Sequence, residues 1–94
     1  MNDSTLARLW EVIEARKSQQ PSGSYTVHLL QAGEDEILKK IGEEAIEVIV
    51  AAKGQGDERV VCEIADLCYH VMMLLAVRGQ SWHDVAAELE RRLT

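Results

Sequence analysis

One stretch of the chain, from Ile64 to Val77, is apolar on nearly every face of the helix that its residue types favour. A helix without a polar face has to be covered on every side. The chain has 94 residues, which suffice for one small domain and few covering elements. We therefore expect a single domain over residues 1–94 whose core is completed by a second copy, as a homodimer or an assembly of dimers.

The rest of the sequence divides into helical segments separated by glycine, serine and proline. Apolar residues at helical spacing predict a first helix that ends near Gln19: Leu6, Leu9, Trp10 and Ile13. Residues 21–24 break it, and residues 25–31 predict one or two helical turns. Further helices are predicted over 34–53, from a capping Asp57 to residue 78, and over 81–93. The fold class expected is all-α, a compact bundle of four to five helices.

Charge and apolar runs exclude several classes of function. The formal net charge of −6 argues against nucleic-acid binding, which needs a basic face. No signal peptide fits the N-terminus, and the nearly apolar run Val71 to Val77 is too short to cross a bilayer. Cys62 and Cys68 lie on different faces of one predicted helix and are expected to be reduced core thiols. We expect a cytoplasmic protein that binds neither membrane nor nucleic acid.

Two pairs of acids, each three residues apart, lie on the two long predicted helices: Glu44 with Glu47, and Glu63 with Asp66. The second pair opens the apolar helix, where ionised carboxylates are costly without a partner. Mg²⁺ prefers oxygen ligands and commonly bridges carboxylates to phosphates. The four acids therefore predict a magnesium site. Cations on the same two helices are candidate phosphate contacts: Lys39, Lys40, Lys53 and Arg59.

Each of these features also has a purely structural interpretation. An isolated pair of acids on a helix is ordinary solvated surface, and only the combination of both pairs favours a metal. From the residues alone, His70 is a phosphate contact or a core histidine, with the core role favoured. The segment from Ser24 to Thr26 either lines a pocket or caps a helix. A non-enzymatic helical dimerisation module with surface acids remains an alternative.

The motifs themselves resemble those of a known family. Residues 40–48, K-I-G-E-E-A-I-E-V, and residues 63–70, E-I-A-D-L-C-Y-H, resemble the signatures of the phosphoribosyl-ATP pyrophosphatases, which belong to the MazG-like all-helical nucleotide pyrophosphatases. The resemblance implies hydrolysis of 1-(5-phosphoribosyl)-ATP to 1-(5-phosphoribosyl)-AMP and pyrophosphate, the second step of histidine biosynthesis. A MazG-type house-cleaning nucleotide pyrophosphatase, which shares only the EExxE and ExxD motifs, is the alternative.

The resemblance also implies roles for individual residues. It assigns Mg²⁺, with Mn²⁺ as a substitute, to the metal ligands Glu44, Glu47, Glu63 and Asp66. It makes Glu43 a candidate for orienting water or a basic side chain. We expect the general base to be one of two candidate catalytic acids, Glu43 or Glu44. The positions implied to contact the phosphoribosyl-nucleotide substrate are Lys40, Lys53, Tyr69 and His70. Cys68 departs from the family, in which leucine is commoner there, and both residues are apolar.

Overall fold

The chain folds into α-helices joined by short connections. The computed structural model describes residues 3–94, and within them there are five helices and no strand. They are α1 (Asp3–Gln19), α2 (Tyr25–Ala32), α3 (Glu34–Gly54), α4 (Asp57–Arg78) and α5 (Trp82–Leu93). The all-α class expected from the sequence is therefore confirmed.

The helix ends follow the local chemistry of the sequence, with one difference. The Ser24 side chain accepts a hydrogen bond from the Val27 backbone N–H at the start of α2, and Ser81 forms a capping box at α5. The expected cap of α4 is wrong by one residue, because Gly56 is the N-cap and Asp57 is already helical. The Asp57 carboxylate still lies in the first turn, where the helix dipole favours negative charge.

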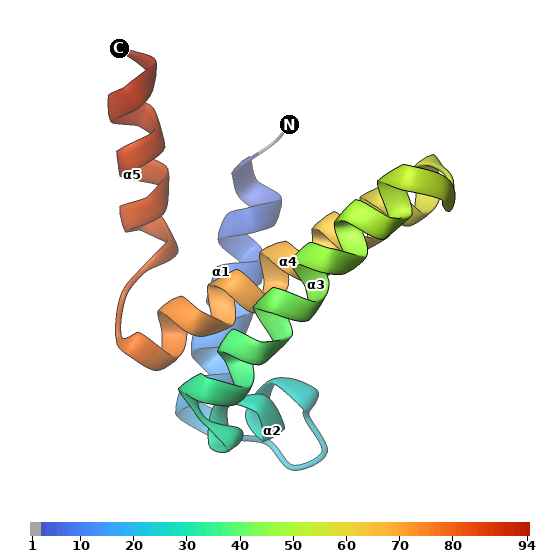
Figure 1. The fold of residues 1–94 in the computed structure, drawn as a ribbon. Coiled ribbons are helices and arrows are strands. Elements are labelled where there is room, and N and C mark those ends of the chain that lie inside the picture. The colour runs from blue at the N-terminus through green and yellow to red at the C-terminus, as the bar shows by residue number, and fades with distance from the viewer. Residues whose placement is uncertain (1–2) are drawn as a thin grey trace.

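Helices α3 and α4 form a long antiparallel hairpin, and α1 and α2 pack against the half of it that lies away from the connecting turn (Figure 1). The buried apolar cluster lies in that half: Trp10, Ile13, Leu29, Ile37, Met72, Met73 and Ala76. The predicted stripe of α1 supplies two of these side chains, and Leu6 and Leu9 pack against them. The core thus joins the two arms of the hairpin to α1 and α2 in the half that lies away from the connecting turn.

The half of the hairpin that carries its turn extends beyond α1 and α2 (Figure 1). Large apolar side chains are exposed there, including Ile46 (62%), Ile49 (62%) and Val61 (68%).

The single chain also leaves other parts open, since helix α5 has no buried residue. The radius of gyration is 14.2 Å, against about 12 Å for a compact chain of this length. Cys62 is also exposed, so the expectation that it is a core thiol is wrong for the single chain.

Helix α4 is long and apolar enough, by length and composition alone, to cross a membrane. The nearly apolar run from Val71 to Val77 is too short to do so by itself, and only the whole helix reaches the required length. The central helix of a globular bundle passes the same test. Because Met72, Met73 and Ala76 of α4 are buried in the core, we interpret α4 as such a helix.

Candidate active site

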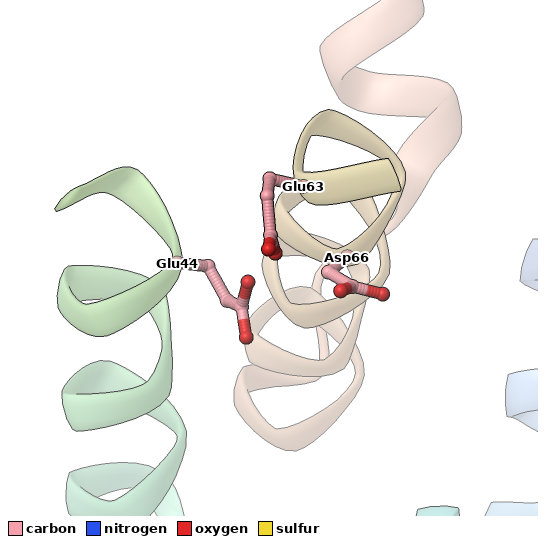
Figure 2. A group of neighbouring side chains, drawn as sticks. All are labelled: Glu44, Glu63 and Asp66. Carbon is pink, nitrogen blue, oxygen red and sulfur yellow. The ribbon is translucent and has the colours of Figure 1, made fainter. Parts of the chain in front are cut away.

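Three acids from the two arms of the hairpin converge. Glu44 reaches from α3 toward α4, from which Glu63 and Asp66 project (Figure 2). One carboxylate oxygen from each of the three lies within 4.8 Å of the others. The register of the hairpin explains the meeting, since Glu44 and Asp66 each stand eleven residues from Gln55 in the turn (55 − 44 and 66 − 55). We call these three residues the acid cluster.

The members of the acid cluster differ in exposure. Glu63 is buried at 5% exposure, Glu44 is half-buried, and Asp66 is exposed. The expectation that Glu63 and Asp66 are both set into the apolar surface therefore holds for Glu63 alone. The Oε2 atom of Glu44 is buried and has no hydrogen-bond donor among the described residues. A buried carboxylate oxygen without a donor is costly, and a cation placed there would remove the cost.

The cluster shifts the pKa values of its two inner acids in opposite directions. Burial raises the pKa of Glu44 to about 7, and the charges of Glu47, Asp66 and Glu63 add to the effect. For Glu63 burial also raises the pKa, but the hydrogen bond and charge of the Arg59 guanidinium outweigh it and hold the pKa below its usual value. Without a metal, Glu44 is therefore the acid that takes up a proton, which it can donate to Glu63.

Arg59 closes one side of the acid cluster. It lies one turn before Glu63 on α4 and forms an ion pair with the Glu63 carboxylate. A pocket beside the pair is lined by Glu47, Val50, Gln55, Arg59 and Glu63. Glu47 is exposed and lies outside the three converging oxygens, although its charge reaches Glu44. Of the four predicted metal ligands, the structure thus brings three together and leaves Glu47 at the rim.

The candidate residues Glu43, Lys40 and Lys53 lie outside the acid cluster. The Lys40 ammonium is 3.7 Å from a Glu43 carboxylate oxygen, and both side chains are well exposed. Lys53 is exposed in the last turn of α3 and does not line the pocket beside Arg59. In the single chain these three side chains therefore face solvent.

The candidate residues Tyr69 and His70 contact α2 instead of solvent. The Tyr69 hydroxyl hydrogen-bonds with the hydroxyl of buried Thr26. His70 is 6% exposed, and its Nδ1 lies 2.7 Å from the Asp66 carbonyl oxygen while its Nε2 lies 3.3 Å from the Tyr25 hydroxyl. A carbonyl only accepts, so Nδ1 carries a proton, and neutral His70 accepts from Tyr25 at Nε2.

These contacts answer the question that the sequence left open at residues 24–26. Ser24 caps α2, Tyr25 and Thr26 bond to α4, and all three also line a pocket with Arg16. The partnership of Tyr25 with His70 was missed from the sequence. The two residues are 45 positions apart, and no local pattern pairs them.

Comparison with known proteins gives one consistent result. A family model described as phosphoribosyl-ATP pyrophosphohydrolase matches residues 6–93. A phosphoribosyl-ATP pyrophosphatase of Pelotomaculum thermopropionicum is 56% identical over 84 residues, which cover 89% of this chain and 86% of the relative. A phosphoribosyl-ATP pyrophosphatase of Sulfurisphaera tokodaii is 47% identical over 93 residues, which cover 99% of each chain. A histidine biosynthesis bifunctional protein of Caldanaerobacter subterraneus is 46% identical over 93% of this chain and 42% of its own length.

Proposed function

This chain belongs to the phosphoribosyl-ATP pyrophosphohydrolase family of enzymes, and we propose that it hydrolyses 1-(5-phosphoribosyl)-ATP to 1-(5-phosphoribosyl)-AMP and pyrophosphate in histidine biosynthesis. The observation that carries the proposal is the convergence of Glu44, Glu63 and Asp66 across the hairpin. Hydrolysis of a phosphoanhydride requires charge neutralisation and a positioned water more than covalent chemistry from the protein. Three acids facing one another suit that task through a cation.

We further propose that the acid cluster holds Mg²⁺, with Mn²⁺ as a substitute. The residues fit a hard divalent ion, because they offer only carboxylate oxygens and because the buried Oε2 of Glu44 lacks a donor. Glu47, at the rim, would complete the set of four ligands. When bound, such an ion supplies neutralisation of the phosphate charge and a lowered pKa of bound water.

The proton of the attacking water goes to Glu44 in this proposal. A carboxylate has two oxygens, so one oxygen of Glu44 can hold the ion while the other accepts the proton of the water. Glu43 is the weaker candidate, because its exposed carboxylate is near Lys40 and outside the cluster. Lys40 and Lys53 remain proposed substrate contacts at the outer rim. His70 would contact substrate from the α2 side, and Tyr69 would do so through its ring, because the Tyr69 hydroxyl bonds to Thr26.

We also propose that the enzyme works in the cytoplasm as a homodimer or an assembly of dimers. Exposed apolar side chains lie on the same two arms of the hairpin as the acid cluster: Ile46, Ile49, Val50, Val61 and Ile64. Side chains of this size gain about 1.5–3 kcal/mol each when they are buried. A second copy placed over this surface would bury them and enclose the cluster, which the single chain leaves open on the Asp66 side.

The deciding experiment measures pyrophosphate release from phosphoribosyl-ATP with and without Mg²⁺, beside a panel of free nucleotides. The proposal expects Mg²⁺-dependent turnover of phosphoribosyl-ATP and far slower release from ATP, dCTP or dUTP. Equal turnover of a free nucleotide would favour a house-cleaning pyrophosphatase. No hydrolysis of any nucleotide, together with a melting temperature insensitive to Mg²⁺, would favour a dimerisation module.

A further inference from the structure

Among the described residues, one cation forms an ion pair with a member of the acid cluster, and the carboxylate in that pair is also a proposed metal ligand. Glu63 is the buried member of the cluster, and its Oε2 is paired with an Arg59 amino group. The same carboxylate is one of the three whose oxygens converge within 4.8 Å. In the proposed function Glu63 binds a divalent ion, so Arg59 and that ion compete for one side chain.

The two partners of this ion pair differ in their freedom to move. The Arg59 side chain is 52% exposed, whereas the Glu63 side chain is 7% exposed. Glu63 is held in place between the helices, and the guanidinium can swing on its flexible stem without disturbing the core. A divalent ion beside Glu63 would repel the guanidinium, which removes the attraction that holds Arg59 in its present position.

The space into which Arg59 can move is the adjoining pocket lined by Glu47, Val50, Gln55, Arg59 and Glu63. This pocket opens directly beside the acid cluster, so a phosphate chain bound at the cluster would extend along it. A guanidinium binds phosphate oxygens through two parallel hydrogen bonds. Gln55 adds an amide that can donate to the same oxygens.

From these observations we propose that Arg59 is an exchangeable counter-ion: it neutralises Glu63 while the metal is absent, is displaced when the metal binds, and then binds the departing pyrophosphate. The inference rests on the proposed function, since it takes the metal and the pyrophosphate product from it. It goes beyond that function in giving Arg59 two alternative partners. Glu63 is the partner before the metal arrives, and a phosphoryl group is the partner afterwards.

The first test measures metal binding alone, without nucleotide, on chelator-treated protein. At pH 8, titration with Mn²⁺ followed by electron paramagnetic resonance gives the dissociation constant. Because Arg59→Gln removes the competing charge, it should bind Mn²⁺ about tenfold more tightly than the wild type. Arg59→Lys keeps the charge and should stay near the wild type. Arg78→Gln is the matched control, since it removes another exposed ion pair of α4, with Glu34, and should change nothing.

The second test measures binding of inorganic pyrophosphate at saturating Mg²⁺ by calorimetry. Arg59→Gln should bind pyrophosphate about tenfold more weakly, and Arg78→Gln should match the wild type. Tighter Mn²⁺ binding combined with weaker pyrophosphate binding supports the exchange. Unchanged or weaker Mn²⁺ binding in Arg59→Gln overturns it, as does unchanged pyrophosphate binding.

These outcomes separate the inference from the function beneath it. If wild type and Arg59→Gln agree in both titrations while phosphoribosyl-ATP is still hydrolysed with Mg²⁺, the exchange is wrong and the function stands. If the wild type binds no Mn²⁺ at all, the metal site of the proposed function is wrong and the exchange falls with it.

Discussion

Glu44 and Glu63 face each other across the α3–α4 hairpin, and their pKa values are displaced in opposite directions, that of Glu44 upward to about 7 and that of Glu63 downward. The difference arises because Arg59 pairs with Glu63 and Glu44 has no such partner. Two neighbouring carboxylates with separated pKa values divide between proton acceptor and charged ligand. This asymmetry can be measured directly through the pH dependence of stability.

Removal of Glu44 should abolish part of the pH dependence of stability in the metal-free protein. A raised folded-state pKa means that the folded state binds the proton more tightly than the unfolded chain. The contribution of Glu44 to stability is therefore complete below the ordinary glutamate pKa of 4.5 and is lost as pH rises to about 7. Urea unfolding of chelator-treated protein should show stability falling between these values, and Glu44→Gln should flatten that fall. An identical slope in the variant would contradict the assignment.

Asp66→Asn should abolish both metal binding and turnover without unfolding the chain. Asp66 is exposed, so its amide analogue leaves the core intact, but it removes one of the three converging carboxylates. The loss of activity should exceed the about 100-fold that removal of an outer-shell partner of a metal costs. Mn²⁺ titration, turnover and circular dichroism check the three parts. Glu58→Gln, an exposed acid of the same helix outside the cluster, is the control and should retain full activity.

The acid cluster was largely predictable because helix periodicity and hairpin register are local properties. Glu47 and Glu63 each lie eight residues from Gln55 (55 − 47 and 63 − 55), so any hairpin turning there brings them level. The direction of each side chain was not predictable from spacing. Glu47 and Asp66 are exposed while Glu63 is buried, because rotamers and the packing angle of α3 on α4 decide these details.

The contacts of α2 were beyond prediction for a different reason. The Tyr25–His70 and Thr26–Tyr69 hydrogen bonds join residues more than 40 positions apart. The sequence contains many other polar residues that could be paired across helices equally well. The sequence supports helix α2 and its Ser24 cap, which depend on neighbouring residues. It contains no local signal for the face of α4 on which α2 packs.

Tyr69→Phe tests whether Tyr69 is a structural residue or a substrate contact. The structure assigns its hydroxyl to buried Thr26, so the variant leaves the Thr26 hydroxyl without that partner. The free energy of unfolding should fall by about 1 kcal/mol, with KM nearly unchanged. Chemical denaturation and steady-state kinetics measure the two quantities. A raised KM at unchanged stability would instead place the Tyr69 hydroxyl on the substrate.

The dimer proposal predicts that a charge on the exposed hairpin surface separates the subunits. Ile49 and Val61 are 62% and 68% exposed in the single chain, which suits side chains that a second copy covers. Ile49→Glu or Val61→Glu places two buried charges in a symmetric interface, so the dimer dissociation constant should rise by about 100-fold or more. Sedimentation velocity measures the change. Leu93→Glu, at an even more exposed apolar position on α5 (80%), is the control and should leave the assembly intact. If the hairpin variants sediment like the wild type, the second copy does not bind at this surface.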